Sequence, residues 1–285
     1  MEASMPERQV VRLGAAQHMS AMSSLRSVVE TLAPDGDAFV IQAPEDWAQG
    51  RTLYGGMTAA LAYESAKRTH GELGPLRSAQ FALIGPATGR LRFVSTLLRR
   101  GRSSAMISTE CVNDDGAVAR AIFVFGAARE SKVAHDFLPI PDVPSPDACG
   151  PFRKEGPNPA RGFWTNFETR LGAGGRIFDV AAPRPEFAIW TRFVDAGDAD
   201  PMTALLAIAD CPPPAAMVHF PQPGPISTMT WAIDILRIPP SIEGWWLLQS
   251  SSEHTADGYS MQNMNMWSES GEAIAAGRQT VAIFV

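Results

Sequence analysis

Two short stretches, Met57-Thr-Ala-Ala-Leu-Ala62 and Met202-Thr-Ala-Leu-Leu-Ala207, are identical at five of six positions. Each stretch lies in a segment rich in Ala and Leu, 56–70 and 201–210, which is typical of a helix buried against a sheet. Self-similarity between two halves of one chain indicates a duplicated structural unit. We therefore expect two copies of one module, each built around a central helix.

The segments that follow each helix have the residue pattern of antiparallel strands. In the first copy they are 77–84, 91–98, 104–112 and 117–128. In the second copy they are 228–238, 245–252, 259–267 and 273–284. Asn113-Asp-Asp-Gly116 is a strong hairpin turn, and Glu269-Ser-Gly-Glu272 occupies the matching position. The methionines of Met261-Gln-Asn-Met-Asn-Met266 recur at strand spacing, so we expect them to form a core face.

An antiparallel sheet wrapped around one helix is the hotdog arrangement. The predicted fold class is therefore α+β: a double hotdog, with two tandem antiparallel sheets each wrapped around a central helix. Seven prolines between Pro139 and Pro159 can sustain neither a helix nor a sheet ladder, and they predict a linker. The expected organisation is an N-terminal hotdog at 23–130, a Pro-rich linker at 131–160 and a C-terminal hotdog at 161–285. Residues 1–22 show no clear period, and we expect a leader that is disordered or was added for expression.

The composition excludes several classes of protein. A 45% apolar share indicates a globular chain, and a net charge of −6 gives no electrostatic reason to bind nucleic acid or an anionic membrane. The longest apolar run, Ala121–Ala128, is far shorter than the roughly 20 residues that span a bilayer. The three cysteines are odd in number and widely spaced, which favours neither disulfides nor a metal cluster. We expect a cytoplasmic protein without a metal ion.

An ordered set of short motifs runs through both halves. It comprises Trp47-Ala-Gln-Gly-Arg-Thr-Leu-Tyr-Gly-Gly56, Trp190-Thr-Arg192, Ala204-Leu-Leu-Ala-Ile-Ala-Asp210, Ile226-Ser-Thr228 and Gly277-Arg-Gln279. Taken together with the duplication, this set resembles the type II acyl-CoA thioesterase family, whose members are double hotdogs. The resemblance covers about 23–285.

The resemblance implies a water-activating site in the second hotdog. In that family an Asp, a Thr and a Gln hold the hydrolytic water, and the matching positions here are Asp210, Thr228 and Gln279. A carboxylate can take a proton from water attacking a thioester, while hydroxyl and amide groups orient that water. Asp210 ends a helix, where a negative charge is disfavoured by about 0.3–1 kcal/mol, so a purely structural role explains it poorly.

The duplication allows a comparison between the two halves. The repeated helices align Asp210 with Ser65, and the hairpin turns align Gln279 with Val124. The polar set is thus absent from the first copy, as expected if one copy keeps the chemistry and the other keeps the scaffold.

Two further groups are candidates for substrate binding. Gly55 and Gly56 stand where the first helix begins, and their backbone N–H groups are candidate donors to an oxyanion. Arg99, Arg100 and Arg102 form a basic hairpin that could meet the phosphates of coenzyme A, although a solvated turn is the simpler interpretation.

The sequence therefore predicts an enzyme that hydrolyses a fatty or related acyl-CoA to the free acid and CoA, without a cofactor. By resemblance, we expect a homodimer or a higher homo-oligomer. Two alternatives remain: a catalytically silent acyl- or CoA-binding hotdog protein, and a double-hotdog enoyl-CoA hydratase, which needs an Asp and a His close together on one loop. The acyl chain, and the choice between CoA and an acyl carrier protein, stay open.

Overall fold

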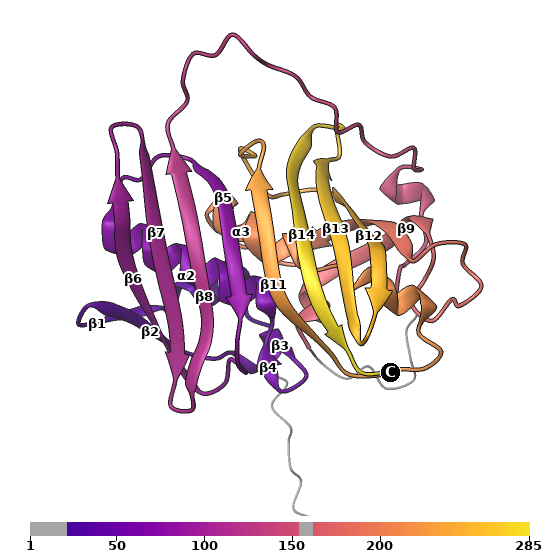
Figure 1. Ribbon diagram of the computed structural model, residues 1–285, viewed down its shortest axis with the longest axis horizontal. Helices are drawn as coiled ribbons and strands as arrows, with labels where there is room; N and C mark the ends of the chain where they lie inside the picture. The colour runs from indigo at the N-terminus through magenta and orange to yellow at the C-terminus, as the bar shows by residue number, and fades with distance from the viewer. Residues whose placement is uncertain (1–21, 154–161) are drawn as a thin grey trace, which may run out of the picture.

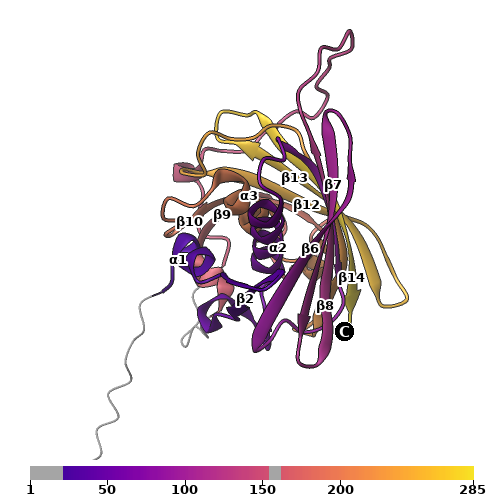
Figure 2. The same ribbon diagram turned by 90° about the vertical axis from the view of Figure 1, so that its left-hand side faces the viewer.

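The computed structural model describes residues 22–153 and 162–285, and the rest of the expected leader and linker lies outside these ranges. Twelve strands form one antiparallel sheet that curls around two central helices (Figures 1 and 2). A short hairpin, β3 (Ala48–Gln49) with β4 (Thr52–Leu53), forms a second, two-stranded sheet. The double hotdog is confirmed.

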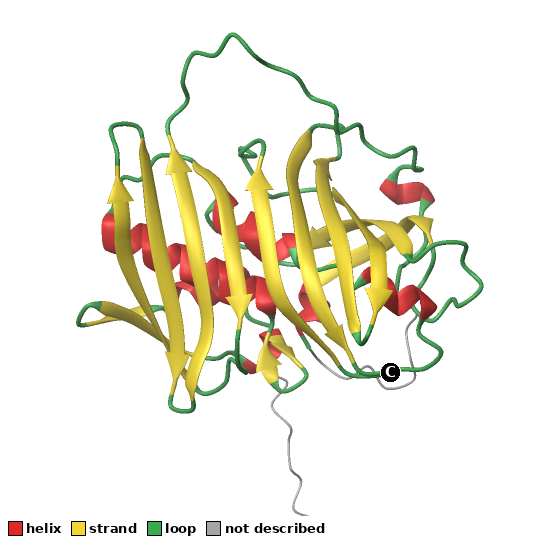
Figure 3. Ribbon diagram, viewed as in Figure 1, coloured by secondary structure: helices red, strands yellow, loops and turns green. Residues whose placement is uncertain are grey.

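The order of strands repeats between the halves, which shows the duplication directly (Figure 1). In both halves, strands lie in front of a central helix (Figure 3). From the outer edge inward, the N-terminal half contains β1 (Ala33–Asp35), β2 (Ala38–Gln42), β6 (Arg90–Arg100), β7 (Ser104–Asn113), β8 (Gly116–Gly126) and β5 (Leu76–Leu83). From the centre outward, the C-terminal half contains β11 (Ile226–Ile235), β14 (Ala273–Ile283), β13 (Tyr259–Ser268), β12 (Trp246–Ala256), β10 (Glu186–Phe193) and β9 (Phe167–Gly174). The predicted strands agree with these bounds to within a few residues.

The two half-sheets join edge to edge at β5 and β11. These strands pair antiparallel from Thr230 opposite Ala82 to Asp234 opposite Ser78. At the centre of the seam the rings of Phe81 and Trp231 stack with centroids 5.0 Å apart, on the buried face of the sheet. The inner edge of each half-sheet pairs with that of the other, so the sheet is continuous. In the described part of the chain, its outer edges are β1 and β9.

Two buried helices fill the concave side of the sheet, as the Ala- and Leu-rich segments predict. Helix α2 spans Gly55–His70 and is buried from Gly56 to Ala66, while α3 spans Pro201–Ala209 and is buried from Met202 onward. A short helix, α1 (Leu25–Glu30), precedes β1, and four 3-10 turns lie at η1 (Glu45–Trp47), η2 (Pro146–Ala148), η3 (Phe163–Asn166) and η4 (Ala215–His219). Within the described ranges, no helix is long and apolar enough to cross a bilayer.

The methionine pattern in β13 is confirmed only in part. Met264 and Met266 are buried, as expected, but Met261 is 37% exposed, so its predicted place in the core is wrong. Met261 stands an odd number of residues from the other two, and side chains alternate between faces along a strand. The inward position belongs instead to Gln262, which is fully buried.

Residues 138–149 of the Pro-rich segment pack on the outer face of the C-terminal half, whereas 131–137 are exposed. The Trp267 indole N–H donates to the carbonyl of Leu138 at 3.0 Å, and the Trp190 indole N–H donates to that of Pro144 at 2.8 Å. Ile140 contributes to the same apolar cluster. The segment therefore connects the halves and also covers apolar surface that the sheet would otherwise expose.

The two central helices run antiparallel and approach closely near one end. The phenol of Tyr54, the residue before α2, donates to the carbonyl of Ala207 in the last turn of α3 at 2.8 Å. A methyl group on Gly56 would lie 2.6 Å from that same carbonyl oxygen. Glycine is therefore required at 56 by the distance between the helices.

We predict that Gly56→Ala destabilises the fold by about 1–3 kcal/mol, the usual cost of forcing a methyl group into a packed core. Urea unfolding followed by circular dichroism measures this cost. Gly150→Ala is the control, because a methyl group there meets no atom within 4 Å. Equal stability of the two variants would contradict the close helix contact.

Candidate active site

Asp210 caps the C-terminal end of α3 and faces the N-terminal end of α2. A methyl group on Gly55 would lie 2.7 Å from its Oδ2 atom, and the backbone N–H of Gly56 donates to its carboxylate. The N-cap residue of α2, Tyr54, supplies no side-chain acceptor, so Asp210 serves as the acceptor from another helix. The positive end of the α2 dipole thereby offsets the unfavourable position of this charge at the end of α3.

Gln279 holds the other side of the carboxylate. Its side chain points inward from β14, is 3% exposed, and donates through Nε2 to Asp210 Oδ1 at 2.6 Å. Its Oε1 accepts a hydrogen bond from Nε2 of Gln262 on the neighbouring strand at 2.9 Å. The structure thus brings Asp210 and Gln279 into direct contact.

A β-bulge determines the direction of Thr228. On β11 the inward residues are Trp231, Ile233 and Ile235, so simple alternation would point Thr228 outward. The register with β14 shifts between Thr228 and Thr230, which places Thr228 opposite the buried Val281. Thr228 consequently lines the same cavities as Asp210, although it forms no hydrogen bond with Asp210 among the described contacts.

Burial controls the ionisation of the site. Loss of solvent around the carboxyl raises the pKa of Asp210 to about 7, and the hydrogen bonds from Gln279 and Gly56 limit that rise. Burial also raises the pKa of the adjacent Tyr54 phenol and Cys211 thiol, so both stay protonated at neutral pH. Asp210 is therefore the acidic group of this site that titrates near neutrality.

Asp210 lies where two cavities of different character meet. One, of about 130 Å³, is lined mostly by apolar side chains: Phe152, Phe163, Trp164, Ile189, Met217 and the three prolines 212–214. The other, of about 560 Å³, is lined by Gly50, Arg51, Thr52, Gly55, Gly85 and Ser227 among others. Gln49, Asp210, Ile226 and Thr228 line both cavities.

The geometry separates the two glycines expected to bind an oxyanion. The N–H of Gly56 already donates to the carboxylate of Asp210, which accounts for that donor without a substrate. Gly55 lines the larger cavity next to Asp210. Gly55 is therefore the candidate oxyanion donor of the two.

The structure does not bring the basic hairpin to this site. The hairpin joins β6 to β7 and carries Arg99, Arg100 and Arg102. Arg100 pairs with Ala105 of β7, which pairs in turn with Phe125 of β8, so Arg100 lies at the height of Phe125 along the sheet. The larger cavity is lined by a different residue of β8, Val118. Seven residues of strand separate these two levels by about 23 Å. The basic side chains that do line cavities with Asp210 are Arg51 in the larger one and Arg153 in the smaller one.

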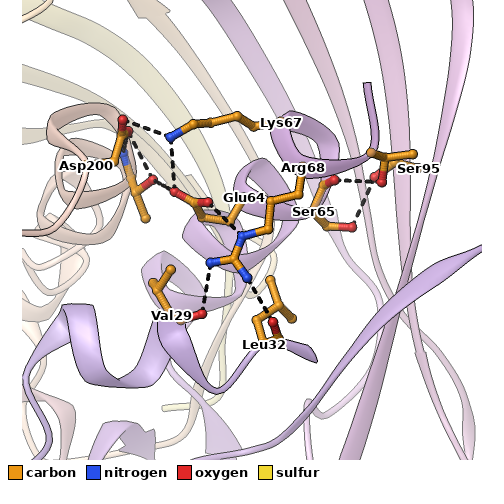
Figure 4. A network of polar contacts seen from close by, with 10 residues as sticks. Val29, Leu32, Glu64, Ser65, Lys67, Arg68, Ser95 and Asp200 are labelled. Carbon is orange, nitrogen blue, oxygen red and sulfur yellow. Dashed lines mark hydrogen bonds and ion pairs between the residues drawn. The ribbon is translucent and has the colours of Figure 1, made fainter. Parts of the chain in front are cut away.

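The corresponding position in the first half carries different chemistry (Figure 4). Ser65, which the repeat aligns with Asp210, is buried and pairs with the hydroxyl of Ser95 at 3.2 Å. Beside it, Lys67 of α2 bridges to Asp200 at the N-cap of α3 at 2.9 Å, and Thr203 donates to Glu64 at 2.6 Å. Ion pairs and hydroxyls thus fill the place that mirrors the carboxylate site.

The alignment of Gln279 with Val124 is wrong in register. Gln279 is on the inner face of the sheet, whereas Val124 lies between the inward residues Phe123 and Phe125. Both hairpins carry a one-residue bulge, but the turn of the second is one residue longer: Asn113 pairs with Gly116, whereas Ser268 bonds to Glu272. The two turns are therefore out of step by one residue, and a slip of one residue changes the face. Both inward neighbours are apolar, so an amide is still absent from this part of the first half.

Gln262 was missed because the methionines around it dominate the pattern. The signal that could have found it is its even spacing from Ser260, Met264 and Met266, the inward residues of β13. A buried glutamine needs hydrogen-bonding partners. Gln262 lies directly across from the buried Gln279, and its side-chain amide donates to that of Gln279.

Comparison with known proteins agrees with this picture in both halves. Residues 43–126 match the family model of the acyl-CoA thioesterase N-terminal domain, and 146–283 match that of the C-terminal domain. The chain belongs to the acyl-CoA thioesterase family. The resemblance to type II thioesterases drawn from the motifs is thereby confirmed. A search of curated protein sequences finds no significant match for this thioesterase-family chain.

Solved structures share the double hotdog over most of their length. A hot dog fold protein of unknown function from Alicyclobacillus acidocaldarius is 25% identical, with a TM-score of 0.81 over 90% of this chain and 97% of the other. The TesB protein of Mycobacterium avium subspecies paratuberculosis is 19% identical, with a TM-score of 0.74 over 92% and 100%. Acyl-CoA thioesterase II TesB2 from Mycobacterium marinum is 16% identical, with a TM-score of 0.71 over 92% and 98%. The two mycobacterial structures support the fold of this family member.

The raised pKa of Asp210 predicts a pH-dependent difference in stability between the wild type and Asp210→Asn. The folded wild type keeps this proton up to about pH 7, whereas an unfolded Asp releases it near pH 4, so the wild type loses stability as pH rises between these values. The variant has no such group. We expect the stability of Asp210→Asn relative to that of the wild type to increase by about 3 kcal/mol from pH 4.5 to pH 8, which raises its relative Tm by roughly 5–10 °C. A difference independent of pH would contradict the raised pKa.

Proposed function

We propose that the protein hydrolyses acyl-CoA thioesters, with Asp210 as general base and with Gln279 and Thr228 holding the attacking water. The observation that supports this most strongly is the Asp210 carboxyl, with its pKa raised to about 7, bonded to Gln279 at 2.6 Å where two cavities meet. A base whose pKa lies near the working pH combines the correct protonation state with useful basicity.

In the proposed reaction Asp210 accepts a proton from water as the water oxygen bonds to the thioester carbonyl carbon. The carbonyl oxygen becomes an oxyanion, and the backbone N–H of Gly55, at the positive end of α2, is the proposed donor to it. Collapse of this intermediate breaks the carbon–sulfur bond. The proton held on Asp210 passes to the departing thiolate, which leaves the free acid and the CoA thiol.

The two cavities favour one orientation of the substrate. We place the acyl group in the smaller cavity, where Phe152, Phe163 and Ile189 offer an apolar wall. The CoA part then follows the larger cavity, whose glycines and hydroxyls suit the amides of its pantetheine arm, while Arg51 suits its phosphates. The thioester between them would lie against Asp210 and Thr228, which line both cavities.

The test is release of free thiol from a panel of acyl-CoA substrates of increasing chain length. We predict that Asp210→Asn lowers kcat by at least about 100-fold, because the amide cannot accept the proton of the attacking water. Ser65→Ala, at the mirrored position in the first half, is the matched control and should keep wild-type turnover.

The same panel separates the alternatives. Turnover by Asp210→Asn at the wild-type rate would rule out Asp210 as the base. Saturable acyl-CoA binding without hydrolysis on any chain would favour the silent binding protein. Addition of water to an enoyl-CoA would favour the hydratase, although no His lines either cavity among the described residues.

A further inference from the structure

Three consecutive hydrogen bonds lead from a loop to the carboxylate of Asp210. The backbone N–H of Ala215 donates to Gln262 Oε1 at 2.7 Å. Gln262 Nε2 donates to Gln279 Oε1 at 2.9 Å, and Gln279 Nε2 donates to Asp210 Oδ1 at 2.6 Å. Gln262 is fully buried and Gln279 is 3% exposed, so water does not compete for these amides.

The first donor fixes the direction of all three hydrogen bonds. A backbone N–H can only donate, so Gln262 must turn its oxygen toward Ala215 and its NH2 group toward Gln279. Gln279 must then accept through its oxygen, which leaves its own NH2 group facing Asp210. Ala215 opens the 3-10 helix η4 after three prolines, where a backbone N–H has no partner within the helix.

We propose that Gln262 is a positioning residue, which fixes the amide of Gln279 so that its Nε2 atom faces Asp210. This inference rests on the proposed function of Asp210 as the base. Gln262 lines neither of the two cavities that contain Asp210, so it acts through Gln279 and not on the substrate.

Loss of this orientation has a defined electrostatic consequence. A Gln279 amide free to turn presents its oxygen to Asp210 part of the time, which favours the protonated carboxyl and raises its pKa further. The other titratable groups around Asp210 are Tyr54, Cys211, Arg153 and Arg51. Among the described residues, none of them forms a hydrogen bond with Gln262, which bonds to Ala215 and Gln279, so a change at Gln262 reaches Asp210 through Gln279.

The primary test is Gln262→Met, which keeps a similar length and removes both hydrogen bonds. We expect kcat to fall about 10- to 100-fold, the range for a misplaced catalytic group, with little change in KM. The acidic limb of the pH–rate profile should move to higher pH by about one unit. Ser260→Ala is the control, because Ser260 is buried on the same face of β13 as Gln262. It removes a hydroxyl that bonds to the hydroxyl of Ser252 on β12 at 2.9 Å. This control should lower stability without moving the acidic limb.

A double-mutant cycle with Gln279→Met separates positioning from a structural role. Once Gln279 is replaced, Gln262→Met should neither reduce kcat further nor move the limb, whereas independent effects would add. Should Gln262→Met fail to fold, Gln262→Glu retains the shape. In its ionised form Glu accepts from Ala215 but cannot donate to Gln279, so the limb should again move to higher pH.

A second readout does not depend on turnover. The pH range over which the wild type loses stability relative to Asp210→Asn should move upward when Gln262→Met is introduced into both. An acidic limb and a stability profile that stay at their wild-type pH, in an active wild type, would overturn the role of Gln262. Absence of hydrolysis by the wild type would overturn the proposed function instead, and the stability profile would still test the positioning.

Discussion

The close antiparallel contact between α2 and α3 is the constraint on which the site depends. Gly56 allows the backbone of α3 to approach, and Tyr54 ties the last turn of α3 through Ala207. The end of α3 therefore meets the beginning of α2, and Asp210 lies over the free N–H groups of that helix. A buried carboxylate is costly unless donors surround it, and this contact supplies them.

The same contact explains how a symmetric fold carries an asymmetric site. Duplication creates two places where the end of one central helix meets the start of the other. At one of them the carboxylate of Asp210 remains beside two cavities. At the other, Lys67 and Arg68 balance the charges of Glu64 and Asp200 (Figure 4). Ser65 bonds there to the hydroxyl of Ser95. A carboxylate beside two cavities in one copy thus corresponds to a network of ion pairs and hydroxyls in the other.

Much of the fold could be predicted because the repeat, the buried helices and the strand alternation are local properties of the sequence. Features that depend on register could not be predicted. Thr228 points inward only because of the bulge beside it, and Val124 points outward despite its alignment with Gln279. The inward direction of Gln262 was overlooked because the methionines around it suggested an apolar face. The position of Arg100 relative to the site depends on strand pairing, which the sequence does not reveal.

The most direct test of the account is the titration of the Asp210 carboxyl itself, followed by infrared spectroscopy across pH, with Asp210→Asn used to assign the band. We expect the carboxyl to lose its proton near pH 7, at the same pH where kcat/KM for acyl-CoA hydrolysis reaches half its maximum. A carboxyl that titrates near pH 4, or a rate that does not follow its titration, would contradict it.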